Sequence, residues 1–314
     1  MNKNLNIKLE NNITRKILFN ESMRKHTTFG IGGNVSAFIY PSNKNELKFL
    51  LIEAAKNKIP IFIMGSGSNL LVSDDGFNGM VISLSKTFKE LNISDNFEIN
   101  AGSGVMLSRM VRQAIKQGIG GLESLIGVPG TLGGALVMNA GAYGEEISNY
   151  FISARIININ GEEKIYNKND IEFAYRSSTF TKNDIITHIN FQCKKGNLEL
   201  IKKLKIQSSK KRKASQPLNY RSAGSIFKNP INAPAAGYLI DKAGLKGLKS
   251  GDAEISTKHA NFIINHGNAK SSDVINLIKK IQKDVLLKFN VRLKLEIKLL
   301  GFKEDLNKDV YVKN

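Results

Sequence analysis

The spacing of apolar residues predicts three amphipathic helices in this chain. In the first, residues 42–58, apolar side chains recur every three or four positions behind Ser42, a residue type that caps helix N-termini. The second runs from residue 105 to 117 and ends at Gly118, which suits the left-handed position after a helix. The third follows Ser271-Ser272-Asp273 and ends near residue 290. The side chains expected to face the interior are Leu47, Leu50, Leu51 and Ala54, then Leu107, Met110, Val111, Ala114 and Ile115, then Val274, Leu277, Ile278, Ile281 and Val285.

Shorter apolar runs and period-two alternation predict strands between these helices. Residues 60–64 form a short apolar strand, and residues 154–166 alternate and turn at Asn160-Gly161, which predicts a hairpin. Residues 291–299 alternate strictly, so their odd-numbered apolar side chains share one face and Glu296 projects from the other. Residues 196–215 are polar and basic and predict a helix or linker between domains. Residues 302–314 are polar, which predicts a frayed end.

Two glycine-rich segments are candidate ligand-binding loops. The first, residues 65–69, directly follows the strand at 60–64, and its missing side chains let backbone N–H groups approach an anion closely. Leu70 stands where the common dinucleotide fingerprint needs a third glycine, and the chain has no Walker A loop. The second, residues 127–144, contains six glycines beside Thr131 and Asn139 and predicts a chain that wraps around a ligand. Packing of a helix against a strand would explain only Gly133 and Gly134.

Residues 220–230, YRSAGSIFKNP, place a single reactive hydroxyl on a flexible backbone. Ser225 follows Gly224 and lies between the basic residues Arg221 and Lys228. A Gly-Ser step by itself is typical of a turn. In combination with the glycine loops, however, such a hydroxyl is a candidate proton donor to a reaction centre.

The composition and charge of the chain limit its possible functions. The chain has 314 residues, Lys+Arg 46 against Asp+Glu 27 and a formal charge of +19, but the basic residues are spread out and only residues 210–213 form a dense run. This distribution favours a solvated surface over a nucleic-acid face. Cys193 is the only cysteine and the four histidines are scattered, so we expect no disulfide and no metal site. No apolar run approaches the roughly 18 residues that span a bilayer, and no signal segment is visible, which predicts a cytoplasmic protein without membrane contact.

Five segments together resemble the bacterial UDP-N-acetylenolpyruvoylglucosamine reductases. The glycine segments alone indicate only the wider fold of flavoproteins related to vanillyl-alcohol oxidase and p-cresol methylhydroxylase. The Gly-Ser-x-Phe-Lys-Asn-Pro stretch narrows the resemblance to the reductase, and the order and spacing of the segments match over about residues 20–301. The segments are residues 65–69, 127–144, 175–178, 223–230 and 295–297.

The resemblance implies an α+β fold with three parts. A two-part FAD-binding region of the vanillyl-alcohol oxidase type would occupy residues 1–85 and 86–200, and a smaller α+β substrate domain residues 201–314. The implied reaction is the reduction of the enolpyruvyl ether of UDP-N-acetylglucosamine to UDP-N-acetylmuramate, for peptidoglycan synthesis. FAD would be the bound cofactor and NADPH the hydride donor, with no nucleic acid, membrane or metal involved. The short interval between residues 238 and 247 resembles the branch that lacks an extra substrate-covering loop.

The resemblance also assigns roles to individual residues. Negative charge develops beside the substrate carboxylate when hydride adds, and Arg176 and a protonated Glu296 would stabilise it, while Ser225 would donate the proton. The substrate's diphosphate or uridine would contact Lys213, Lys228 and Asn229. FAD would contact Gly65, Ser66, Gly67, Ser68, Asn69, Leu70, Pro129, Gly130, Thr131, Gly133, Gly134, Asn139, Ala140, Gly141, Ala142 and Tyr143.

Two positions depart from the family pattern. Arg221 stands where proline is frequent, and Ile126 where alanine is frequent, but neither change removes a reacting group.

Two other functions stay open. The first alternative is another flavoprotein oxidoreductase of the same fold that turns over a different substrate. The second is a basic nucleic-acid-binding protein, which would be colourless and would bind duplex with a steep salt dependence.

Overall fold

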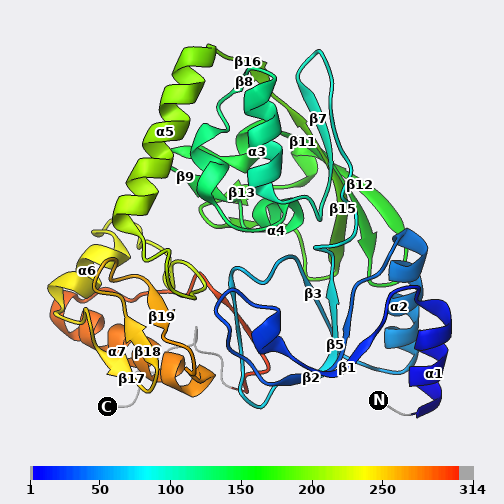
Figure 1. Ribbon diagram of the computed structural model, residues 1–314, viewed down its shortest axis with the longest axis horizontal. Coiled ribbons are helices and arrows are strands. Elements are labelled where there is room, and N and C mark those ends of the chain that lie inside the picture. Colours follow the sequence, from blue (N-terminus) through cyan, green and yellow to red (C-terminus); the bar gives the residue numbers. More distant parts are fainter. Residues whose placement is uncertain (1–2, 304–314) are drawn as a thin grey trace. The chain divides into compact units, whose positions relative to one another are not determined.

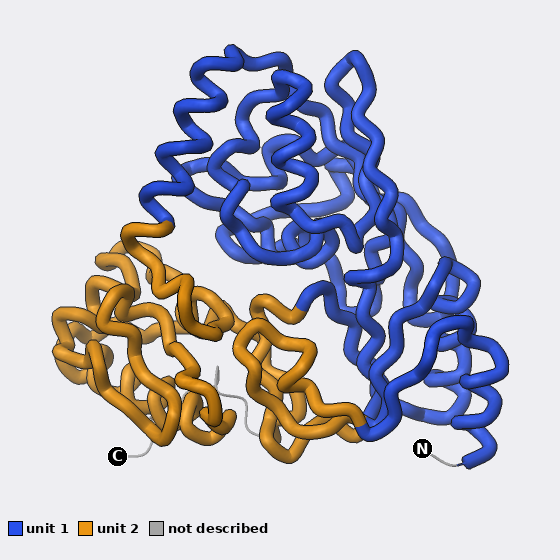
Figure 2. Tube along the Cα trace, viewed as in Figure 1, with its two compact units in different colours: residues 1–20, 36–66, 79–212 blue, residues 21–35, 67–78, 213–314 orange. Residues whose placement is uncertain are grey.

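A computed structural model describes residues 3–303, which belong to two compact units (Figures 1 and 2). Unit 1 comprises residues 1–20, 36–66 and 79–212, and unit 2 comprises residues 21–35, 67–78 and 213–314. From residue 304 on, the polar end expected at 302–314 lies outside the described residues. Both units are therefore built from segments that are far apart in the sequence.

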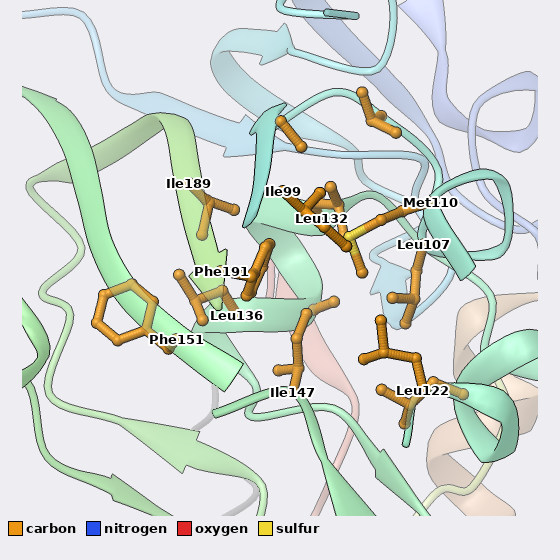
Figure 3. Packing of buried hydrophobic residues seen from close by; sticks show 14 of the residues in the cluster. Ile99, Leu107, Met110, Leu122, Leu132, Leu136, Ile147, Phe151, Ile189 and Phe191 are labelled. Carbon is orange, nitrogen blue, oxygen red and sulfur yellow. The ribbon is translucent and has the colours of Figure 1, made fainter. Parts of the chain in front are cut away.

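The larger core of unit 1 is built on a five-stranded antiparallel sheet of order β12-β11-β15-β7-β6. Helix α3 (Leu107–Lys116) and the short helix α4 (Leu132–Val137) contribute side chains to the same core as the sheet, as Figure 3 shows for Leu107, Leu132 and Ile189. The five inward residues predicted for α3 are all buried, and Gly118 has the expected left-handed φ of 72°. The strands are β6 (Leu91–Ile93), β7 (Glu98–Gly102), β11 (Phe151–Asn158), β12 (Glu163–Asn167) and β15 (Asp184–Gln192).

The other core of unit 1 lies beneath helices α1 (Lys3–Asn12) and α2 (Lys44–Lys56). The four inward residues predicted for α2 are buried, but its cap is not Ser42. The Asn43 side chain accepts the N–H of Glu46 at 3.0 Å, while the N–H of Ser42 donates to the Glu46 carboxylate at 2.7 Å, so the helix begins later than predicted. The sheet has the order β1-β2-β5-β3, with β1 (Leu18–Ser22), β2 (Asn34–Ile39), β5 (Phe77–Ser83) and β3 (Ile61–Met64).

Unit 2 has a single core between two helices and two small sheets. Helix α7 (Ser271–Phe289) buries all five predicted inward residues and ends at Asn290 in a left-handed conformation. Its first backbone N–H groups are capped by Asp74, whose carboxylate accepts from Ser271 at 2.8 Å and from Ser272 at 3.1 Å. The other elements are helix α6 (Ala236–Lys242), the sheet β17 (Lys249–Ser250), β18 (Ala253–Ile255), β19 (Ile263–Asn265), and the parallel pair β4 (Leu70–Val72) and β20 (Lys298–Leu300).

The other elements include a long helix, a hairpin turn, short strands and 3₁₀ helices. Residues 196–215, predicted as helix or linker, contain an 18-residue helix, α5 (Leu198–Ser215). The predicted hairpin at 154–166 forms between β11 and β12, with Gly161 at a φ of 82°. The remaining strands are β8 (Ile119–Gly120), β9 (Gly141–Ala142), β10 (Glu145–Glu146), β13 (Phe173–Ala174), β14 (Ser177–Ser178) and β16 (Lys194–Lys195), and the 3₁₀ helices are η1 (Met23–Lys25), η2 (Glu123–Gly127), η3 (Ile147–Tyr150) and η4 (Lys168–Asp170).

The prediction of a strand at residues 291–299 was wrong in part. The strand expected at 291–299 is reduced to β20, because residues before it pair only at Leu295, which forms an isolated bridge with Phe227. The alternation holds in the middle of this run, where Leu293, Leu295 and Ile297 are buried, whereas Val291 and Leu299 are only half-buried. Helix α4 lies inside the glycine segment 127–144. Among the described residues, no helix combines the length and apolarity needed to cross a bilayer.

Candidate active site

The first glycine loop begins in unit 1 and continues in unit 2. The Gly65 carbonyl accepts from the Ser83 hydroxyl at 3.0 Å, and a Cβ added at Gly65 would collide with Oγ1 of Thr131. In unit 2, Gly67 has a φ of 68°, where a side chain is rarely tolerated, and its carbonyl accepts the N–H of Thr28 at 3.1 Å. Leu70 turns its side chain into the protein, so only its backbone is free to face a ligand.

The second glycine segment is fixed within unit 1 by backbone hydrogen bonds to residues 103–107. The Gly130 carbonyl accepts from Leu107 at 3.0 Å, and the N–H of Gly133 donates to the Ser103 carbonyl at 2.9 Å. A Cβ added at Gly133 would lie 3.0 Å from the Cβ of Ser103. Gly133 therefore lets α4 approach this turn closely, which is the packing role that the sequence allowed for it.

Four buried polar atoms near these loops have no hydrogen-bond partner among the described residues. They are Oγ of Ser66, Ser103 and Ser124 and Nε of Arg212. Buried polar groups are normally satisfied, so the cluster indicates a polar ligand. Burial lowers the pKa of the Arg212 guanidinium, and a Cβ added at Gly127 would lie 2.8 Å from Cδ of this side chain. A cation and hydroxyls beside glycine turns fit a phosphorylated cofactor such as the predicted FAD.

Asn139 uses its side chain inside the protein. It is fully buried, and its Nδ2 donates to the Glu146 carboxylate at 2.6 Å and to the Ala174 carbonyl at 3.2 Å. Its Oδ1 accepts from the N–H of Ser148 at 3.3 Å. The side chain thus links the glycine segment to β13 and leaves only backbone atoms for a ligand. At the end of the segment, by contrast, the side chain of Tyr143 is 54% exposed.

Arg176 occupies the turn between β13 and β14 in unit 1. Its φ of 55° is uncommon for a residue other than glycine, asparagine or aspartate. Its Nη2 donates to the Gly141 carbonyl at 2.9 Å, and its guanidinium lies 5.1 Å from the centroid of the Tyr175 ring. The glycine segment therefore holds the guanidinium, and a strained backbone presents it, as is frequent at functional sites.

Ser225 lies in unit 2 on an extended segment that is paired on both sides. It forms a backbone bridge with Phe262, and the next residue, Ile226, accepts the N–H of Glu296 at 2.8 Å. Gly224, with a φ of 80° and open space around it, makes the turn that leads into this segment. In the part of the chain that the structure describes, the Ser225 hydroxyl makes no hydrogen bond, so it is free to donate to a ligand.

Glu296 is joined to the glycine loop as well as to the Ser225 segment. Nδ2 of Asn69 donates to the Glu296 carbonyl at 3.1 Å, and the N–H of Lys298 donates to the Asn69 carbonyl at 3.0 Å. Unit 2 thus brings together Ser225, Glu296 and one of the predicted FAD contacts, while Arg176 belongs to unit 1.

The predicted substrate contacts also belong to unit 2. The Lys213 carbonyl accepts from Nζ of Lys258 at 2.6 Å, and both residues line a cavity of about 600 Å³. The N–H of Lys228 pairs with the Lys294 carbonyl at 2.9 Å. Asn229 is exposed, and its Oδ1 accepts the first N–H of α6 at 3.0 Å.

Two residues at the site were missed by the sequence analysis. The sequence analysis placed Arg212 only in the basic run at residues 210–213. The half-burial of a single arginine leaves no pattern in the sequence. Asn261 is 4% exposed and bonds both backbone groups of Phe227, which a lone asparagine likewise does not signal.

Comparison with known proteins defines first the class and then the family. Residues 35–165 match the family described as FAD binding domain, so the chain is a flavoprotein and the predicted α+β fold with an FAD-binding region is confirmed. Residues 216–300 match the C-terminal domain of UDP-N-acetylenolpyruvoylglucosamine reductase. The chain belongs to the UDP-N-acetylenolpyruvoylglucosamine reductase family.

Individual relatives support this assignment over most of the chain. The reductase of Clostridium tetani is 42% identical over 304 residues, which cover 93% of this chain and 95% of the relative. That of Carboxydothermus hydrogenoformans is 42% identical over 300 residues, with 94% and 98% covered. The crystal structure of the reductase from Thermus caldophilus has a TM-score of 0.76 and 32% identity, and covers 91% of this chain and 98% of that one.

Proposed function

We propose that this protein reduces the enolpyruvyl ether of UDP-N-acetylglucosamine to UDP-N-acetylmuramate, with NADPH as the electron source and FAD as the bound cofactor. Family membership supports the reaction, and the unsatisfied polar atoms beside the glycine turns support FAD. FAD, when bound, supplies the hydride that adds to the terminal carbon of the enolpyruvyl group. The protein's own residues then manage the charge and the proton.

Arg176 stabilises the negative charge that develops next to the substrate carboxylate. A guanidinium is permanently charged and planar, so it pairs with a carboxylate in a fixed geometry. The hydrogen bond from Nη2 to the Gly141 carbonyl supports this role, because it fixes the group before substrate arrives and so reduces reorganisation in the transition state.

Ser225 donates the proton that completes the reduction, and Glu296 in its protonated form donates a hydrogen bond to the enol-like intermediate. The single observation that supports this assignment is the backbone hydrogen bond of 2.8 Å from Glu296 to Ile226, the residue after Ser225, which places the two candidate residues on paired segments. The Ser225 hydroxyl has no partner among the described residues and is therefore available as a donor.

Lys213, Lys228 and Asn229 contact the diphosphate or uridine of the substrate in this proposal. The cavity of about 600 Å³ lined by Lys213, Lys258 and Tyr220 supports the role of Lys213, because ammonium groups beside an aromatic ring suit a nucleoside diphosphate; Lys228 and Asn229 do not line this cavity. The FAD contacts proposed from the resemblance stand with one refinement, namely that Asn139 and Leu70 contribute backbone atoms only. We also propose the three-part division at residues 1–85, 86–200 and 201–314, and a cytoplasmic location.

One visible-spectrum experiment tests the function. The purified protein should be yellow, NADPH should bleach it in the absence of oxygen, and the enolpyruvyl UDP-sugar should restore the colour with formation of UDP-N-acetylmuramate. A protein that is reoxidised by oxygen but not by the UDP-sugar would instead be a different flavoprotein oxidase. A colourless protein that binds duplex DNA would support the nucleic-acid alternative.

A further inference from the structure

Asn261 in unit 2 bonds the backbone of Phe227, two residues after Ser225. Its Oδ1 accepts the N–H of Phe227 at 2.9 Å, and its Nδ2 donates to the carbonyl of the same residue at 2.8 Å. Asn261 is 4% exposed and Phe227 is 1% exposed. One buried amide therefore satisfies both backbone groups of one buried residue.

The same segment is held from two sides. On the Asn261 side, the Asn261 carbonyl accepts the N–H of Ile226 at 2.9 Å. On the other side, the Ile226 carbonyl accepts from Glu296 at 2.8 Å, and the N–H of Lys228 donates to the Lys294 carbonyl at 2.9 Å. Asn261 supplies the only side-chain bonds to Phe227 within the described residues, so it holds the side of this segment that faces away from the Glu296 segment.

We propose that Asn261 is a positioning residue for the proton-transfer step: it anchors the segment that carries Ser225 from the side opposite Glu296, so that the Ser225 hydroxyl keeps its place when the intermediate forms. This inference rests on the function proposed above. Gly224 makes such an anchor necessary, because a flexible residue with open space around it cannot by itself hold the segment that follows.

Loss of the Asn261 amide should affect proton transfer more than any earlier step. It would leave a buried N–H and a buried C=O unpaired, which favours a shift of the backbone at residues 225–228. A displacement of roughly 1 Å can cost about 100-fold in rate where geometry is decisive. Reduction by NADPH does not need the Ser225 proton and should be spared.

Asn265 provides a matched control in the same unit. It is 3% exposed, its Nδ2 donates to the Phe29 carbonyl at 2.9 Å, and its Oδ1 accepts from Gly267 at 2.7 Å and from Ala269 at 3.1 Å. Its side chain is as deeply buried as that of Asn261 and as fully bonded, but it bonds no atom of residues 225–228. Asn265→Ala therefore reports what the loss of a buried amide does by itself.

The test compares Asn261→Ala, Asn261→Asp and Asn265→Ala in the full FAD-loaded chain. For Asn261→Ala we expect reoxidation of the reduced enzyme by the enolpyruvyl UDP-sugar to slow by about 10- to 100-fold. Its solvent deuterium isotope effect should rise, because proton transfer becomes limiting. Reduction by NADPH should stay within about twofold of wild type for all three variants. Asn261→Asp keeps the acceptor for the Phe227 N–H and should lie between wild type and Asn261→Ala.

A second measurement reads the backbone directly. In FAD-free protein, Asn261→Ala should speed amide hydrogen exchange in peptides that contain Ile226 and Phe227, whereas Asn265→Ala should not. Equal reoxidation rates for Asn261→Ala and Asn265→Ala would overturn the positioning role. If Asn261→Ala does not fold, wild-type reoxidation by Asn261→Asp would overturn it. If the wild type itself is not reoxidised by the UDP-sugar, the proposed function fails, and this inference falls with it.

Discussion

The two regions that carry the candidate catalytic groups are built by different means. In unit 1, Arg176 sits in a two-residue turn at a φ of 55°, and its side chain is held by the Gly141 carbonyl. In unit 2, Ser225 and Glu296 lie on extended segments whose backbones are bonded to each other through Ile226. The first region places a candidate cation on a strained backbone, and the second places a candidate hydroxyl and a candidate carboxyl on paired segments.

This difference predicts how each region responds to substitution. Where the backbone is left-handed, the choice of residue changes stability and chemistry together, because side chain and strain are linked. Where the backbone is extended and paired, a side chain can be removed with little effect on the fold. Stability and half-reaction rates measured together should therefore separate the two regions.

The largest effect should follow Ser225→Ala. Loss of a positioned proton donor typically costs about 10²- to 10⁴-fold, so reoxidation of the reduced enzyme by the UDP-sugar should fall by that factor. Reduction by NADPH and the thermal midpoint should be unchanged, because the hydroxyl bonds nothing else among the described residues. Stopped-flow absorbance of the two half-reactions checks this, with Ser222→Ala as the control. Unimpaired reoxidation in Ser225→Ala would remove Ser225 from the mechanism.

Arg176→Ala and Arg176→Gly test the strained region. Both should slow reoxidation by about 10²- to 10³-fold, since both remove the guanidinium that stabilises developing charge. Arg176→Gly should nevertheless unfold with a free energy about 1 kcal/mol higher than Arg176→Ala, because glycine accepts the left-handed turn.

The same pair of substitutions at Lys294, on the extended segment of unit 2, provides the contrast. Lys294 is exposed, and it is not among the residues with positive φ. There glycine should be less stable than alanine by about 0.5–1 kcal/mol, since it only adds freedom to the unfolded chain. Urea unfolding of all four variants measures both differences. The same sign at both positions would mean that the turn at Arg176 is not strained.

Glu296→Gln and Glu296→Ala should differ by a smaller factor. Glutamine can still donate a hydrogen bond, and one such bond to a charged group is worth about 1.5–3 kcal/mol, so Glu296→Gln should reoxidise at least about tenfold faster than Glu296→Ala. Both variants should bind FAD normally, because Asn69 bonds the backbone of Glu296 and not its carboxyl. Equal reoxidation rates would contradict the donor role.

Local patterns in the sequence predicted the helices and the chemistry better than the pairing of segments. The inward faces of α2, α3 and α7 follow from apolar spacing alone, and every residue predicted for them is buried. The strand expected at 291–299 was shortened because its partners, such as Phe227, lie far away in the sequence and pair at isolated points. Apolar periodicity predicts which face of a strand is buried, but it does not predict which other strand pairs with it.

The sequence predicted site residues where glycines lie next to reactive side chains. It did not predict residues of common types that only the fold buries. Ser225 was found through Gly224, whose left-handed φ of 80° marks the turn that leads into the Ser225 segment. Asn139 was read as a cofactor contact because it follows glycines, but its amide is used by protein groups. Asn261 bonds a residue 34 positions away in the sequence, and Arg212 has a buried Nε without a partner among the described residues; no local pattern in the sequence marks either.

The smallest expected effect comes from an ion pair outside both regions. Hydrogen bonds from Lys48 and Lys44 lower the pKa of Glu163 to about 2 from an ordinary value of 4.5. Since the folded value is the lower one, the stabilisation is present above about pH 4.5 and is lost as the pH falls toward 2. The side chain is 48% exposed, so solvent screening keeps the contribution below about 1 kcal/mol.

We therefore expect Glu163→Gln to lower the free energy of unfolding slightly at neutral pH and to flatten its decline between pH 4.5 and 2, as urea unfolding at both ends of that range would show. Both half-reactions should keep their wild-type rates, because these ion pairs join α2 to β12 and include none of the three reacting groups. This variant sets the baseline against which Arg176→Ala and Ser225→Ala are judged. If it slowed reoxidation as they do, slow reoxidation would be a general response to weakened folding, and the contrast between a strained cation and an aligned donor pair would lose its support.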